Sequence, residues 1–221
     1  MKVLFEDNHL LIVNKPIGVL VQGDVTGDEP LVEIAKLYVK EKYKKPGAVF
    51  LGVVHRLDRP VSGVVVFART SKALARMNAQ FRDKKTKKTY WAIAEHRPSP
   101  PAGRLVHWLV KDEKKNKTTA YSKENDQGKR SELDYKLLAS QGPYNLIEVN
   151  PITGRPHQIR VQLASINCPI VGDLKYGYPT ANEDANICLH AKKLEFIHPV
   201  TRESMIVEAD PPQLGVWNIF C

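Results

Sequence analysis

Long hydrophobic runs and cysteine-based motifs are both missing from this chain of 221 residues. No stretch approaches the ~18 consecutive apolar residues of a transmembrane helix, so we expect no membrane span. The first residues, Met1–Asp7, become acidic at once and lack the apolar core of a secretory signal. The three cysteines, Cys168, Cys188 and Cys221, are widely spaced. They predict neither a disulfide framework nor a zinc site, and they favour a cytoplasmic location.

Motifs of several common enzyme classes are also absent. There is no Gly-x-Gly-x-x-Gly, no phosphate-loop lysine motif and no Gly-x-Ser-x-Gly nucleophile elbow. His190 follows Cys188 by two residues, but no second Cys/His pair has metal-ligand spacing. His55 could support a serine or cysteine nucleophile, yet nothing marks such a partner. These absences argue against the corresponding chemistries.

Positive charge is what the chain has in excess. Lysine and arginine number 33 against 24 acidic residues, for a net charge of +9. The excess gathers in three blocks, at residues 40–45, 82–88 and 111–117. Any one block could be a solvated helix end or loop. Three blocks on one chain favour a nucleic-acid partner, RNA or DNA.

Hydrophobic periodicity and turn signals predict the elements of the first half of the chain. We expect a hairpin over 3–5 and 10–13, a helix opened by Pro30, a buried strand over 49–54, a strand over 64–68, and a helix capped by Thr70 and Ser71. A strand over 89–94 follows the second basic block.

The second half is predicted to be mostly strands. We expect strands over 105–110, around Tyr121, and over 133–138, 145–149, 187–191 and 205–208, with a helix opened by Thr153–Pro156. The charged region 111–130 is predicted to be a long basic hairpin loop. Strands and helices do not alternate, so we predict an α+β fold in one domain, residues 1–221. Its mixed, mostly antiparallel sheet would be flanked by helices and carry a central catalytic cleft.

The segment His55–Gly63 reads His-Arg-Leu-Asp-Arg-Pro-Val-Ser-Gly and runs straight into an apolar strand. Its carboxylate, Asp58, stands between Arg56 and Arg59, which favour the ionised form. The turn-prone sequence would present that carboxylate at the end of a rigid element, as suits a nucleophile. The plainer interpretation is a turn aspartate held by a neighbouring arginine.

Two further residues suggest chemistry. Arg160 lies one turn after His157 in the predicted third helix, and it could meet Asp58 across a cleft and fix its direction. Otherwise it is a helix-surface arginine. Tyr90 could be a stacking platform for a base, with its phenol offering a hydrogen bond. The commoner role of such a strand tyrosine is half-buried packing.

These segments resemble the RluA family of RNA pseudouridine synthases. The His55–Gly63 segment is similar to the family's signature, Asn14–Gly18 to its first motif, Lys88–Tyr90 to the strand with its tyrosine, and Thr153–Leu163 to its basic-residue helix. Weaker late motifs match at Gly172-Asp173, at Tyr176-Gly177 and at Leu189–Ala191. The resemblance covers about residues 3 to 208.

The resemblance implies an isomerase that detaches uracil from its ribose within RNA, turns it and reattaches it through carbon 5, without a cofactor or metal. Asp58 would act on the nucleotide, Arg160 would pair with it and move as the substrate enters, and Tyr90 would stack on the uracil. A stacked uridine hides its glycosidic bond, so base flipping would be needed. We assign substrate contacts to the following residues: Lys15, His55, Arg56, Lys84, Lys85, Lys87, Lys88 and His157.

The chain departs from the family in places. Val61 stands where threonine is common, residues 111–130 match poorly, and we expect no N-terminal RNA-binding domain. The RNA could be ribosomal or transfer RNA, and we expect a monomer. Two other classes are alternatives: a noncatalytic RNA-binding protein on the same scaffold, and a metal-dependent nucleic-acid hydrolase. The second is disfavoured because arginines rather than carboxylates surround Asp58.

Overall fold

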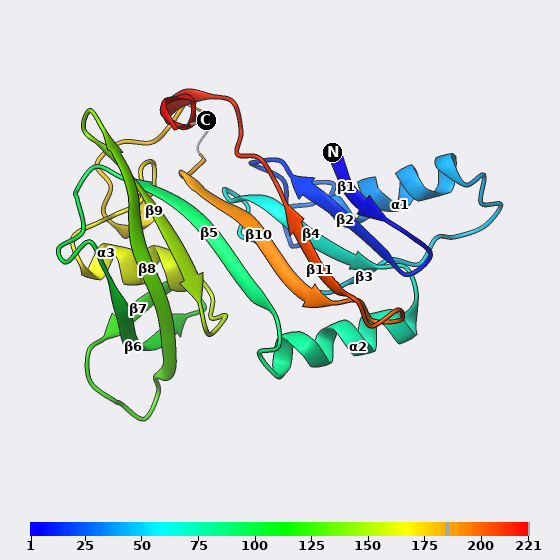
Figure 1. The fold of residues 1–221 in the computed structure, drawn as a ribbon, viewed down its shortest axis with the longest axis horizontal. Helices are drawn as coiled ribbons and strands as arrows, with labels where there is room; N and C mark the ends of the chain where they lie inside the picture. The colour runs from blue at the N-terminus through cyan, green and yellow to red at the C-terminus, as the bar shows by residue number, and fades with distance from the viewer. Residues whose placement is uncertain (184–185, 221) are drawn as a thin grey trace. The chain divides into compact units, whose positions relative to one another are not determined.

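The structure is a computed structural model that describes residues 1–183 and 186–220 (Figure 1). The chain divides into two compact units. The first unit comprises residues 1–86 and 191–212, and the second comprises residues 87–190 and 213–221. Cys168 and Cys188 are buried free cysteines, while Cys221 lies outside the described residues. No helix in the described ranges is long and apolar enough to cross a bilayer.

The first unit is a sheet with two helices. It contains β1 (Lys2–Glu6), β2 (Leu10–Lys15), α1 (Leu31–Lys42), β3 (Gly52–Val53), β4 (Ser62–Ala68), α2 (Ser71–Arg82), most of β10 (Leu189–Ile197) and β11 (Ser204–Glu208). The strand order is β1-β2-β4-β10, with β11 paired to β10 and β3 to β4. The β1–β2, β2–β4, β3–β4 and β10–β11 pairs are antiparallel.

The core of the first unit explains why β4 lacks polar alternation. All seven residues of β4 are buried, as expected for a central strand covered on both faces. One cluster joins Leu10 and Ile12 of β2 with Val64 and Val66 of β4, and Met77 of α2 packs into it. The predicted hairpin, the strand over 64–68 and the two helices are confirmed.

Helix α2 begins where its capping residues predict. The Thr70 hydroxyl accepts a hydrogen bond from the Ala73 N–H at 3.1 Å, which satisfies one of the unpaired donors of the first turn. The strand predicted over 49–54 is largely wrong. Only Gly52 and Val53 form a strand, and they pair with the end of β4, because β4 lies between β2 and β10 and its edges are already paired.

The second unit is a five-stranded antiparallel arrangement with a short helix. It contains β5 (Lys87–Ala94), β6 (Ala102–Asp112), β7 (Lys117–Tyr121), β8 (Lys129–Gln141), β9 (Tyr144–Pro151), α3 (Gln158–Ser165), the short helices η1 (Leu174–Tyr176) and η2 (Gly215–Ile219), and the start of β10. The strand order is β5-β9-β8-β6-β7, and each neighbouring pair is antiparallel. The predicted α+β class with a mostly antiparallel sheet is confirmed.

The long loop predicted over 111–130 is wrong. Strand β6 runs on to Asp112, and β7 returns from Lys117, so a tight turn joins them. The register pairs Asp112 with Lys117 and Trp108 with Tyr121. The strand predicted around Tyr121 is confirmed as the end of β7, which starts four residues earlier, at Lys117.

The third helix starts later than predicted. Thr153–Pro156 form a turn, and His157 is the N-cap of α3 with a left-handed backbone, φ 54°. Gln158 holds that turn, since its side-chain oxygen accepts from the Thr153 hydroxyl at 2.8 Å and from the Arg155 N–H at 3.0 Å.

Gly63, at the start of β4, offers a test of this packing. Its φ is +117°, and an added Cβ would lie 2.3 Å from the Ala191 carbonyl oxygen of β10. We expect Gly63→Ala to lower the free energy of unfolding by about 3–5 kcal/mol, measured by urea denaturation.

The matched control is Gly177→Ala. Gly177 has φ +98°, but an added Cβ meets nothing within 4 Å. It should therefore cost only the backbone strain of about 1–2 kcal/mol. Equal losses in the two variants would contradict the close β4–β10 approach.

Candidate functional site

Asp58 occupies a turn whose backbone is held from several directions. The Val61 N–H donates to the Asp58 carbonyl at 3.1 Å, and the Gly18 N–H donates to the Arg59 carbonyl at 3.0 Å. The Arg59 Nε returns a bond to the Gly18 carbonyl at 2.9 Å, and its Nη1 lies 2.8 Å from an Asp28 carboxylate oxygen. Leu57 is buried, while Asp58 itself is half-buried. The carboxylate thus stands on a turn fixed to the end of β2.

Lys15 is part of that fixation and is completely buried. Its Nζ donates to the Pro16 carbonyl at 2.9 Å and to the Arg59 carbonyl at 3.1 Å. Burial lowers the pKa of Lys15 to about 7, while the Asp58 charge opposes that shift and the Arg59 charge adds to it. The assignment of Lys15 to substrate contact is therefore corrected, because an ammonium sealed beneath the Asp58 turn cannot reach an RNA phosphate.

His55 also makes contacts within the protein. Its Nε2 accepts the Val66 N–H at 3.2 Å, and its ring stacks on Phe81 with centroids 4.9 Å apart. One ring face and Nε2 of the half-buried His55 thus join the turn to β4 and α2, and its contact with the substrate stays a prediction. Arg56, the next residue, is exposed.

The lysines of the second basic block follow α2. Lys84, Lys85 and Lys87 are exposed and Lys88 is half-buried. Lys84 has a left-handed backbone, φ 55°, which ends the helix and turns the chain toward β5. Tyr90, on β5, is half-buried and pairs with Val149 of β9. The exposed lysines remain candidates for phosphate contact.

Arg160 is buried in α3 rather than lying on its surface. Its Nε and Nη2 donate to the two carboxylate oxygens of Asp173 at 2.7 and 2.8 Å. The two side chains are only 7% and 1% exposed. Such a bidentate pair fixes the plane of the guanidinium. Removing one partner of a buried pair typically costs about 3–5 kcal/mol, so the arrangement is rigid.

The aromatic ring of Tyr176 packs against the same guanidinium. Its ring centroid lies 5.1 Å from Cζ of Arg160, within cation–π range. Its hydroxyl accepts the Thr118 N–H at 2.8 Å and lies 2.7 Å from Nδ1 of His157. Burial raises the pKa of Tyr176, so the phenol keeps its proton at neutral pH. His157, half-buried, is thereby oriented by Tyr176.

Asp173 and Tyr176 were missed as partners of Arg160. The signal was present as Gly172-Asp173-x-x-Tyr176-Gly177, which matched only a weak late motif. Asp173 lies 13 residues from Arg160, and nothing in the sequence says which cation a buried carboxylate will meet.

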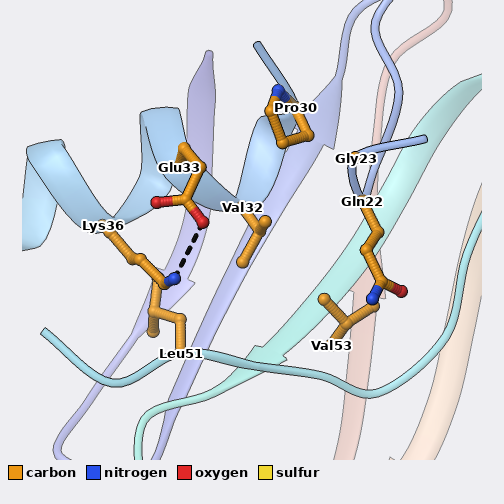
Figure 2. Close-up of a pocket in the computed structure, with 8 residues that line it drawn as sticks. All are labelled: Gln22, Gly23, Pro30, Val32, Glu33, Lys36, Leu51 and Val53. Carbon is orange, nitrogen blue, oxygen red and sulfur yellow. Dashed lines mark hydrogen bonds and ion pairs between the residues drawn. The ribbon is translucent and has the colours of Figure 1, made fainter. Parts of the chain in front are cut away.

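Figure 2 shows a pocket in the first unit, of 520 Å³. Its lining residues are Gln22, Gly23, Pro30, Val32, Glu33, Lys36, Leu51 and Val53. Glu33 and Lys36 form an ion pair at its edge, with 2.8 Å between Nζ and Oε1. None of the residues predicted to be functional lines this pocket. In the described ranges, no group of three or more His, Cys, Asp or Glu side chains is placed to hold a metal ion.

Comparison with known proteins identifies related sequences. A family model described as RNA pseudouridylate synthase matches residues 9–165, a range that contains Asp58, Tyr90 and Arg160. Dual-specificity RNA pseudouridine synthase RluA of Haemophilus influenzae is 33% identical over 213 residues, which cover 95% of this chain and 92% of that protein. Ribosomal large subunit pseudouridine synthase C of Vibrio cholerae is 31% identical over 94% of this chain and 64% of its own length. The chain thus spans less than two thirds of the Vibrio protein.

A solved structure agrees with the sequence matches. Human RNA Pseudouridylate Synthase Domain Containing 4 superimposes with a TM-score of 0.80 at 26% identity, covering 96% of this chain and 89% of that one. The pseudouridine synthase fold expected from the sequence is confirmed.

The buried Lys15 predicts a pH dependence of stability. Its pKa is about 7 in the folded chain and 10.5 when solvated, so the unfolded state binds more protons between those values. Stability should therefore rise with pH across pH 7–9. Lys15→Met removes this contribution and should reduce the slope by up to about 1.4 kcal/mol per pH unit. Urea denaturation at pH 7, 8 and 9 measures it.

Lys40→Met is the control, because Lys40 is exposed on α1. It should keep the pH slope of the unmodified chain. If Lys15→Met also kept that slope, Lys15 would not be buried as described.

Proposed function

This chain belongs to the RNA pseudouridylate synthase family, and we propose that it converts uridine to pseudouridine within RNA. The conversion is an isomerisation: the bond between N1 of uracil and C1′ of ribose breaks, and a bond between C5 and C1′ forms. The C5 proton leaves and N1 gains one, so no oxidant or other reactant is consumed. The observation that carries the proposal is the family match over residues 9–165, which includes all three candidate catalytic residues.

Asp58 is proposed to be the carboxylate that acts on the nucleotide. Its turn is fixed by the buried Lys15 and by the exchange of hydrogen bonds between Gly18 and Arg59. A carboxylate that must meet one carbon of a flipped nucleotide benefits from such a rigid mount, because small misplacements are costly in rate.

Arg160 is proposed to pair with Asp58 during the reaction. Asp173 accepts from Nε and from one N–H of Nη2, and a guanidinium has five N–H groups in a fixed fork. The ion pair with Asp173 therefore sets the direction of the other three N–H groups. We assign Asp58 as one acceptor of those groups, which would hold it ionised and directed at the nucleotide.

Tyr90 is proposed to stack on the target uracil and to serve as a proton-transfer group. Exposed Arg56 would fill the place of the extruded nucleotide or bind a nearby phosphate. Unstacking a base costs a few kcal/mol, which contacts with the phosphate backbone can offset.

The relatives' names suggest the class of RNA. Several are ribosomal large subunit pseudouridine synthases, and the Haemophilus protein is described as dual-specificity. We propose ribosomal RNA as the first substrate to test, with transfer RNA beside it. The cytoplasmic location and the monomeric state predicted from the sequence stay predictions.

Asp58→Asn tests the proposed reaction. The amide keeps the shape of the side chain but cannot act as the anionic group, so pseudouridine formation should fall below detection while RNA binding persists. Tritium release from RNA labelled at C5 of uridine measures turnover, and filter binding measures affinity.

Asp210→Asn serves as the control, because Asp210 is an exposed carboxylate paired with Lys2 and Lys192. It should leave turnover unchanged. Turnover retained by Asp58→Asn would remove Asp58 from the mechanism. An inactive unmodified chain that still bound RNA would favour the alternative of a noncatalytic RNA-binding protein.

The second basic block makes a separate prediction. Replacing Lys84, Lys85, Lys87 and Lys88 by glutamine should weaken RNA binding, because each phosphate contact releases counterions. The slope of log Kd against log salt should flatten by about 0.7–0.9 for every lysine that contacts a phosphate. Titrations between low and moderate salt give the slope.

A control with glutamine at Lys40, Lys44 and Lys45 lowers the net charge at the end of α1 and just after it instead. These residues are exposed, and we expect a smaller change in slope. Equal flattening per charge in both variants would mean that general attraction, not contact at residues 84–88, drives the binding.

A further inference from the structure

The β6–β7 hairpin carries four lysines and two carboxylates over residues 111–117, and Lys111 pairs with Glu113 at 2.6 Å. Its turn presents Lys114 and Lys115, both exposed, with Lys111 and Lys117 on the flanking strands. Lys175, next to Tyr176, donates to the Asn116 carbonyl in this turn at 2.9 Å. An anionic partner that binds the turn therefore acts on a structure already joined to η1.

Tyr176 is one of several connections between this hairpin and α3, beside the bond from the Gln162 side chain to the Leu105 carbonyl of β6 at 3.3 Å. Its hydroxyl accepts the Thr118 N–H of β7 at 2.8 Å, and Nζ of Lys117 lies 5.9 Å from its ring centroid. The ring also packs with Leu109 of β6 and Val161 of α3 in one small apolar cluster. Tyr176 is itself only 8% exposed.

The same tyrosine is joined to the start and the middle of α3. Its hydroxyl lies 2.7 Å from Nδ1 of His157, the left-handed N-cap. The donor in this hydrogen bond depends on the imidazole tautomer, and in either case the contact joins the hydroxyl of Tyr176 to the N-cap of α3. The face of the ring lies 5.1 Å from Cζ of Arg160.

One short segment thus holds the guanidinium of Arg160 in two ways. Asp173 pairs with Nε and Nη2, while Tyr176, three residues later, lies against Cζ. The Tyr176 N–H donates to the Asp173 carbonyl at 3.1 Å, so the two side chains are parts of one turn. A shift of the hairpin would move Tyr176, and with it the surroundings of Arg160.

We propose that Tyr176 is a positioning residue that couples the lysine-bearing β6–β7 hairpin to Arg160, so that RNA held by the hairpin sets the guanidinium for reaction. The inference rests on the proposed function and extends it by assigning a role to a residue that does not itself touch the reacting atoms. If the hairpin served only to bind RNA, the hydrogen bonds of the Tyr176 hydroxyl with Thr118 and His157 would have no effect on the reaction rate.

Tyr176→Phe tests the coupling because it keeps the ring against Arg160 and removes only the hydroxyl. With ribosomal RNA transcripts as the probe, we expect the single-turnover rate at saturating RNA to fall about tenfold, as small misplacements of reacting groups do. The Kd for RNA should change less than about threefold, because the lysines remain.

Tyr178→Phe is the matched control. Tyr178 is equally buried and donates to a carboxylate oxygen of Glu95 at 2.5 Å, so its loss also removes one hydroxyl from the second unit. Both variants should lower the Tm, but only Tyr176→Phe should lower the rate. A rate loss in both would indicate general destabilisation and would overturn the proposal.

A double-mutant cycle separates coupling from a merely structural role. Lys114→Gln with Lys115→Gln should lower the single-turnover rate at saturating RNA in the unmodified chain, and should lower it no further in Tyr176→Phe. Independent effects multiply, whereas coupled ones do not. Multiplying effects would overturn the proposal, as would lysine variants that change affinity alone. The lysine substitutions leave the core unchanged. If Tyr176→Phe folds poorly, the lysine variants alone still test the proposal, because a change in affinity without a change in the single-turnover rate overturns it.

The activity of the unmodified chain separates a failure of the proposed function from a failure of the role proposed for Tyr176. If it releases no tritium, the proposed function fails. If it is active and the cycle is multiplicative, only the role of Tyr176 fails.

Discussion

The buried ion pair between Arg160 and Asp173 is the constraint on which the second unit depends. The charge of an arginine side chain that is only 7% exposed must be compensated, and Asp173 does so with both oxygens. This pairing fixes α3 against the segment that begins at Asp173, and it brings Tyr176 of that segment to the guanidinium. The geometry of the candidate catalytic arginine is therefore decided by a carboxylate that does no chemistry in the proposed reaction.

The first unit also contains a buried cationic side chain, and backbone carbonyls compensate its charge. Lys15 is buried beneath the Asp58 turn and donates to the carbonyls of Pro16 and Arg59. Its lowered pKa shows that burial opposes its charge, and the Asp58 charge partly offsets that effect. In the first unit the buried cation stabilises the turn of Asp58, whereas in the second unit the buried cation, Arg160, is itself the residue proposed to act. Such a cation is costly in stability, and both are compensated by fixed polar groups.

Most of the fold could be predicted because its signals are local. Alternating and continuous apolar runs marked the β1–β2 hairpin, β4 and β5, and Thr70 marked the start of α2. The failures had non-local causes. Strand β3 is short because its pairing with β4 extends for only two residues. The loop expected over 111–130 is instead shortened by the pairing of β6 with β7, which reaches Asp112 and Lys117. Helix α3 starts later than predicted because the Gln158 side chain holds the preceding residues in a turn.

The sequence by itself determined which residues are candidates for chemistry. The spacing around Asp58, Tyr90 and Arg160 marked a family, and the lysine excess indicated a polyanionic partner. Only the tertiary structure decided which neighbouring polar residues bond within the protein, as the buried Lys15 and the half-buried His55 do. It also decided that Arg160 meets Asp173 and Tyr176. Burial and pairing depend on which distant segments pack together, and a local pattern of residue types does not contain that information.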